Sequence, residues 1–89
     1  MHIQVFVEMP PDPCPACGET VELARKLRRN YTVDLIDVNL QRFNRDARAW
    51  DDATGGHVPA IRLIRKNGIE WIRGKSEVLR FKEKMEGRS

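Results

Sequence analysis

The sequence predicts an α/β fold with elements in the order βαβαββα, and three observations lead to this prediction. Strand-like segments, in which every second residue is apolar, are followed along the chain by segments with helical periodicity. The first three segments read strand, helix, strand, an order that predicts a parallel strand pair joined by a crossover. Later in the chain, Asn67-Gly68 lies between two apolar segments and is a strong hairpin signal. With 89 residues, the chain is expected to form a single domain over residues 1–89.

Residues 2–8 are predicted to form the first strand, because apolar and β-branched residues recur there with a period of two. The apolar face of this strand consists of Ile3, Val5 and Val7, and the opposite face of Gln4, Phe6 and Glu8. The proline-rich segment 9–13 then predicts a stiff loop, since proline cannot donate to a sheet ladder. We expect this loop to deliver Cys14 to a defined place.

From Cys14 to about Arg29, apolar residues recur at helical spacing and charged residues fill the remaining positions. The predicted apolar stripe of this helix consists of Cys17, Val21, Ala24 and Leu27. Both cysteines therefore fall in the first turn. Pro15 suits this turn, because a first-turn proline gives up only an N–H that would lack a partner in any case.

The remaining pattern predicts three more strands and two more helices. Residues 32–38 are expected to form the second strand, and residues from about 42 to 52 the second helix, with Phe43, Ala47 and Trp50 on its apolar side. Residues 58–64 and 69–73 are expected to form the hairpin. Residues from about 75 to 86 place Val78, Phe81, Lys82 and Met85 near one stripe, so this last helix is expected to pack over the sheet.

Composition and charge exclude several classes of protein. The net charge is +3, from 16 basic and 13 acidic residues, and the densest basic run, residues 25–29, is expected to be a solvated helix surface and not a nucleic-acid site. No stretch approaches the roughly 18 apolar residues of a membrane span. Two cysteines are far fewer than a disulfide-rich secreted scaffold contains, and the first residues lack the features of a secretory signal. We therefore expect a cytoplasmic protein that binds neither nucleic acid nor membranes.

The motif Cys14-Pro15-Ala16-Cys17 is the most informative part of the chain. Two thiols two residues apart, after a strand and at the start of a helix, are typical of a dithiol redox centre. The same spacing also occurs in half of a zinc site. Such a site takes four protein ligands, however, and only His2 and His57 could complete it, because there is no second cysteine pair. Redox chemistry is the favoured interpretation; metal binding and an inert pair of thiols are the alternatives.

With this pair at the start of the first helix and Val58-Pro59 just before the third strand, the chain resembles the thioredoxin fold in its minimal, glutaredoxin-like form. Arg73-Gly74, between the last strand and the last helix, adds a less specific similarity. The resemblance covers nearly the whole chain and implies a four-stranded mixed sheet flanked by three helices. It also implies that Pro59 is cis and packs against the cysteine pair, and that the backbone of Val58 pairs with an extended substrate. The alternative for Pro59 is an ordinary trans proline at the start of a strand.

The resemblance implies a thiol–disulfide oxidoreductase. Cys14 is expected to be the nucleophile, because it lies at the more exposed end of the helix, where backbone N–H groups favour a thiolate. Cys17 lies one turn further on the apolar stripe, so it is expected to be shielded and to resolve the mixed disulfide. For a cytoplasmic protein we expect the direction to be disulfide reduction, which makes the protein an electron donor in cell redox homeostasis. The reduction potential, which decides the direction, is not determined by sequence.

A mostly apolar rim around the nucleophile is expected to contact disulfide-containing protein substrates. The expected substrate-binding residues are Pro15, Ala16, His57, Val58, Pro59 and Gly74, and Pro11 and Pro13 extend the rim. His57 is the titratable member: within reach of Cys14 it could stabilise the thiolate or relay its proton, and otherwise it is an exposed loop histidine. Glu8 is a second ionisable candidate, either an acid that helps to deprotonate Cys17 or a solvent-facing residue. Trp50 and Trp71 are expected to be packing residues.

The electron source stays open between glutathione and a thioredoxin-reductase-like enzyme, because the chain departs from the glutaredoxin pattern. Ala16 replaces the usual tyrosine, residues 11–13 replace a lysine, and Arg73-Gly74 replaces Gly-Gly. Ser76 is expected to cap the last helix. We expect a monomer with no permanently bound cofactor and no metal site. Two alternative functions remain, a zinc or iron–sulfur carrier that uses exposed cysteines, and an interaction adaptor with a vestigial redox pair.

Overall fold

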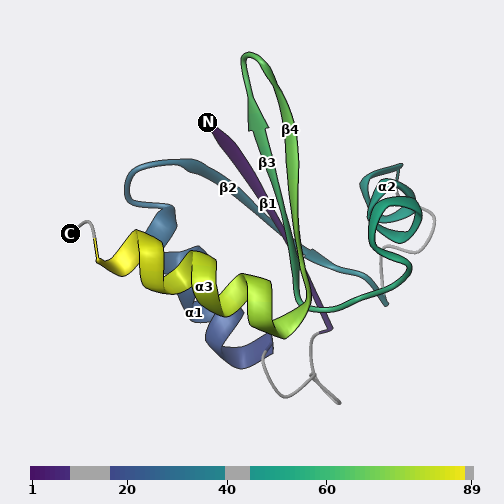
Figure 1. The fold of residues 1–89 in the computed structure, drawn as a ribbon, viewed down its shortest axis with the longest axis horizontal. Helices are drawn as coiled ribbons and strands as arrows, with labels where there is room; N and C mark the ends of the chain where they lie inside the picture. Colours follow the sequence, from purple (N-terminus) through teal and green to yellow (C-terminus); the bar gives the residue numbers. More distant parts are fainter. Residues whose placement is uncertain (9–16, 40–44, 88–89) are drawn as a thin grey trace.

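The computed structural model describes residues 1–8, 17–39 and 45–87, and its elements follow the predicted order (Figure 1). They are β1 (His2–Val7), α1 (Cys17–Leu27), β2 (Thr32–Asp37), α2 (Arg45–Thr54), β3 (Ala60–Arg65), β4 (Gly68–Arg73) and α3 (Gly74–Glu86). The first residues of two predicted helices lie outside the described residues. These are residues 14–16 and residues 42–44, which include Phe43. Five strand boundaries differ from the prediction: β1 ends at Val7 and not Glu8, β3 begins at Ala60 and not Val58, β3 ends at Arg65 and not Ile64, β2 ends at Asp37 and not Val38, and β4 begins at Gly68 and not Ile69. The second difference has a local cause, since Pro59 has no N–H to donate to the ladder.

The four strands form one mixed sheet in the order β2-β1-β3-β4. β1 is parallel to β2, and the pairs β1–β3 and β3–β4 are antiparallel. The predicted parallel pair and the predicted hairpin are both confirmed, and Arg65 pairs with Gly68 at the closed end of the hairpin. This order and topology are those of a minimal thioredoxin-like fold. No helix in the described part of the chain is both long and apolar enough to cross a bilayer.

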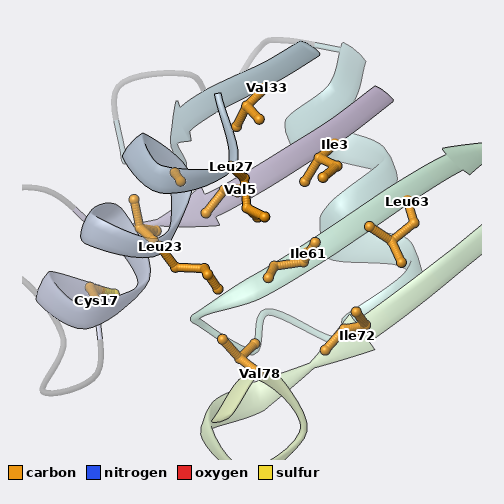
Figure 2. Close-up of a cluster of buried hydrophobic side chains, with 12 residues drawn as sticks. Ile3, Val5, Cys17, Leu23, Leu27, Val33, Ile61, Leu63, Ile72 and Val78 are labelled. Atoms are coloured by element: carbon orange, nitrogen blue, oxygen red, sulfur yellow. The ribbon is translucent and has the colours of Figure 1, made fainter. Parts of the chain in front are cut away.

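The larger core lies between the sheet and the two helices α1 and α3, which cover the same face (Figures 1 and 2). Its buried residues are Ile3, Val5, Val7, Cys17, Leu23, Ala24, Leu27, Val33, Ile61, Leu63, Ile72 and Val78. The predicted inner face of β1 and the predicted stripe of α3 are confirmed. The predicted stripe of α1 is confirmed, with Val21 partly buried against the core, but the prediction missed Thr20 and Leu23, which are both buried. The angle at which α1 lies on the sheet decides which positions beside the stripe are buried.

The opposite face of the sheet is covered by α2, over a smaller core formed by Phe6, Ile36, Val38 and Ala60 (Figure 1). The two tryptophans pack against it, as predicted. The Trp50 ring stacks on Phe6 with a centroid distance of 6.4 Å and an interplanar angle of 12°. The Trp71 ring is tilted against the same phenyl group at 5.5 Å and 36°. Phe6, near the end of the inner strand β1, is therefore the residue that both indole rings contact.

A polar row crosses the same face next to these rings and attaches the start of α2 to the sheet. Gln4 on β1 is in register with Asp34 on β2 and with Arg62 on β3. The buried Gln4 amide donates to Asp34 at 3.4 Å and to Asp46 of α2 at 3.2 Å. Asp46 also forms an ion pair with Arg62 at 3.4 Å. Buried polar groups need such partners, so this row helps to set where α2 lies.

Candidate functional site

Cys17 begins the described part of α1 and lies in the larger core, with 1% of its surface exposed (Figure 2). Its Sγ accepts a hydrogen bond from the backbone N–H of Glu8 at 3.4 Å. The end of β1 and the start of α1 therefore meet at this sulfur. The expected shielding of Cys17 is confirmed. The other motif residues, Cys14, Pro15 and Ala16, and the rim residues Pro11 and Pro13 lie outside the described residues.

Glu8 contacts Cys17 through its backbone, and this is the contact that the structure gives between the two residues. Its side chain is partly exposed, just after the end of β1. An N–H that points at a sulfur stabilises negative charge on it more than it stabilises the neutral thiol. The contact at the Cys17 sulfur therefore comes from the Glu8 backbone, and the role of the Glu8 carboxylate as an acid that helps to deprotonate Cys17 stays a prediction.

Val58 and Pro59 lie at the same end of the sheet. The Val58–Pro59 peptide bond is cis, the geometry that the resemblance implies. Pro59 is fully buried, and the partly buried Val58 packs against both cores. The pairing of Phe6 with Ala60 places Pro59 beside the end of β1, and that end is where Glu8 contacts Cys17.

Gly74 joins this group from the junction of β4 and α3. Its N–H donates to the carbonyl of Pro59 at 2.9 Å. Its φ is +76°, in the left-handed region that favours glycine, and a Cβ at this position would lie 3.9 Å from Cδ2 of His57. His57 itself is exposed. The structure therefore brings His57, Pro59 and Gly74 together, while the separation of His57 from Cys14 lies outside the described residues.

Sequence reasoning missed the contribution of α2 to this group. The Trp50 indole Nε1 donates to the carbonyl of His57 at 2.8 Å. Arg73 Nε donates to the carbonyl of Ala53 at 2.9 Å, which links β4 to the last turn of α2. The sequence predicts only a packing role for Trp50. A helical pattern indicates which face is buried, but it does not indicate which distant backbone group an indole N–H will contact in the folded chain.

The expected cap of the last helix was predicted wrongly. The N-cap residue of α3 is Arg73, and it makes no side-chain capping hydrogen bond. Its backbone N–H instead donates to the Glu77 carboxylate at 3.5 Å. Ser76 is exposed and lies inside the helix, because α3 begins at Gly74, one residue before the predicted start.

Within residues 1–8, 17–39 and 45–87, no three His, Cys, Asp or Glu side chains gather closely enough to hold a metal ion. Comparison of the chain with protein-family models, with curated proteins and with solved structures found no match. The functional interpretation therefore rests on the chemistry of these residues and on their arrangement in a thioredoxin-like fold.

Replacing Gly74 with alanine should lower the free energy of unfolding by about 1–2 kcal/mol, because a Cβ disfavours left-handed backbone geometry. Steric overlap is not the cause, since the nearest atom to the added carbon would be 3.9 Å away. Gly18→Ala is the matched control. Gly18 lies in α1 with nothing within 4 Å of a Cβ, so this change should stabilise the protein by about 0.4–1 kcal/mol. Denaturant unfolding measures both; a Gly74→Ala variant as stable as the wild type would contradict the prediction.

Proposed function

We propose that this protein is a thiol–disulfide oxidoreductase of the glutaredoxin-like type, with Cys14 and Cys17 as its redox couple. The observation that carries the proposal is the position of the Cys17 sulfur. It is buried at the start of α1, accepts the Glu8 N–H, and lies at the end of the sheet where Pro59, Gly74 and His57 converge. A shielded sulfur with a hydrogen-bond donor is suited to the resolving role. The resolving cysteine attacks the mixed disulfide within its own protein, so it does not need to be accessible to substrates in solution.

The reaction is a two-step exchange. The Cys14 thiolate attacks one sulfur of a substrate disulfide, the substrate S–S bond breaks, and the other substrate sulfur leaves as a thiolate. The Cys17 thiolate then attacks the Cys14 sulfur of the mixed disulfide, which releases the second substrate thiol and forms the Cys14–Cys17 disulfide. Two electrons pass from the protein to the substrate, and the two thiol protons of the protein end on the substrate thiols.

The Glu8 N–H contributes to the second step. Cys17 must carry negative charge before it attacks, and a buried sulfur without a donor would resist ionisation. The N–H contact of 3.4 Å provides such a donor without admitting water to the core.

The substrate is proposed to be a protein disulfide in an extended segment, which pairs with the backbone of Val58 beside His57 and Gly74. Because Gly74 lacks a side chain, the backbone of a partner can approach there closely. The proposed setting is the cytoplasm, where a monomer acts as a reductase and receives electrons from glutathione or from a thioredoxin-reductase-like enzyme. Both sources return two electrons to the Cys14–Cys17 disulfide.

An equilibrium redox titration in glutathione buffers tests the proposal, with free thiols trapped by alkylation and counted by intact mass. Both alkylation sites should disappear together in one two-electron transition, and the midpoint places the protein among reductases or oxidants. A stable glutathione adduct would favour glutathione as the electron source. The control is the same titration in denaturant, where the pair behaves as an unstructured dithiol. Two thiols that stay alkylatable throughout, together with co-purifying metal, would support the metal-carrier function instead.

A further inference from the structure

The segment that leads into Pro59 is held by side chains from the last turns of α2. The Trp50 indole donates to the His57 carbonyl at 2.8 Å. The Thr54 hydroxyl donates to the Trp50 carbonyl at 2.8 Å and accepts from the N–H of Gly56 at 3.3 Å. Two side chains of one helix thus fix the backbone on the amino-terminal side of Val58.

The carboxyl-terminal side of Val58 is fixed from another direction. The carbonyl of Pro59 accepts the Gly74 N–H at 2.9 Å. The carbonyls of both neighbours of Val58 therefore have partners inside the protein. Within the described part of the chain, by contrast, no residue hydrogen-bonds to the N–H or C=O of Val58 itself.

Trp50 can hold the His57 carbonyl steadily because its own ring is held. It stacks on Phe6, which is fully buried on β1. Arg73 adds a second connection, because its Nε donates to the carbonyl of Ala53 in the last turn of α2. The His57 carbonyl is therefore connected to β1 through two contacts: its hydrogen bond with the Trp50 indole, and the stacking of that indole on the buried Phe6 ring.

We propose that Trp50 is a positioning residue for substrate recognition, which holds the His57 carbonyl so that Val58 presents its backbone to an extended substrate segment. This inference rests on the proposed oxidoreductase function and adds a residue to its recognition surface. A backbone edge that is already ordered loses little conformational entropy when a substrate strand pairs with it. Since Trp50 acts through a carbonyl and not through a sulfur, it should affect substrate binding and leave the chemical step unchanged.

Trp50→Phe tests this role, because phenylalanine keeps a ring against Phe6 and removes the N–H. For a disulfide within an extended peptide, KM should rise about threefold to tenfold, the usual effect of losing one hydrogen bond. The kcat for that peptide and the rate with the small substrate hydroxyethyl disulfide, which has no peptide backbone to pair, should change by less than about twofold.

Trp71→Phe is the matched control, since Trp71 packs on the same phenyl ring and makes no hydrogen bond to the His57 carbonyl. It should leave the KM unchanged. Thr54→Val, which removes the hydroxyl at nearly constant volume, should raise the KM in the same direction as Trp50→Phe and by a smaller factor. An unchanged KM in Trp50→Phe, or an equal rise in Trp71→Phe, would overturn the inference.

Hydrogen exchange separates failure of this inference from failure of the proposed function, because it needs no redox activity. The Gly56 amide, which donates to Thr54, should exchange faster in Trp50→Phe than in the wild type and in Trp71→Phe. Unchanged exchange would show that Trp50 does not hold the segment, whatever the enzyme activity. If the wild type reduced neither the peptide nor hydroxyethyl disulfide, the proposed function would fail, and the substrate role of Trp50 with it.

Discussion

Replacing Cys14 with serine should lower the rate of disulfide reduction by at least about a thousandfold, because a serine hydroxyl supplies no thiolate at neutral pH. The loss should be the same for a peptide disulfide and for hydroxyethyl disulfide, since both need the first attack. Turnover coupled to an excess of reduced glutathione measures it. The folded state should be retained, because only one sulfur atom is exchanged for oxygen.

Cys17→Ser is the matched control, and it should fail at a different step. The first attack by Cys14 remains, so the variant should accumulate a mixed disulfide that intact mass detects. Cys14→Ser should form no such adduct, because the Cys17 sulfur is 1% exposed and has the Glu8 N–H against it. The opposite pattern, an adduct in Cys14→Ser and none in Cys17→Ser, would reverse the assignment of nucleophile and resolving residue.

Phe6→Ala should lower the free energy of unfolding by about 3–5 kcal/mol, the usual range for removing a fully buried phenyl ring. Phe6 has no exposed surface, and it is the shared partner of the Trp50 and Trp71 rings. Its loss should leave a cavity under α2 that neither indole fills without moving. Because a domain of this size has a total stability of roughly 5–15 kcal/mol, this loss should remove a large part of the free energy of unfolding. Urea unfolding measures the change.

Leu79→Ala serves as the control for that prediction, since Leu79 on α3 is 42% exposed and alanine favours a helix. Its effect should stay within about 1 kcal/mol. A Phe6→Ala variant that loses no more stability than Leu79→Ala would mean that α2 does not cover this face of the sheet.

Phe6→Ala should also affect substrate binding. Because Phe6 supports Trp50, any Phe6→Ala protein that stays folded should show the raised KM expected for Trp50→Phe.

Local patterns were enough to predict the seven elements and their order. The alternation in β1, the hairpin signal at Gly68 and the stripe of α3 each depend on residues that are close in sequence, so their physical causes can be seen there. The errors occurred where two positions satisfied the same local rule. On α1, Thr20 and Leu23 are buried beside the predicted stripe. At the start of α3, Arg73 and not Ser76 is the N-cap residue. In both helices the packing on the sheet decided between neighbouring positions.

The sequence by itself determined the chemistry that is available: a Cys-x-x-Cys pair at the start of a helix, a proline before the third strand and a glycine after the fourth. The tertiary structure alone decided which groups meet at that end of the sheet. The contacts from Glu8 to Cys17, from Trp50 to His57 and from Gly74 to Pro59 all join different segments of the chain. A hydrogen bond needs its two atoms placed to within a few tenths of an ångström. Only the packing of both helical layers on the twisted sheet sets positions that finely, and no periodicity or spacing in the sequence encodes them.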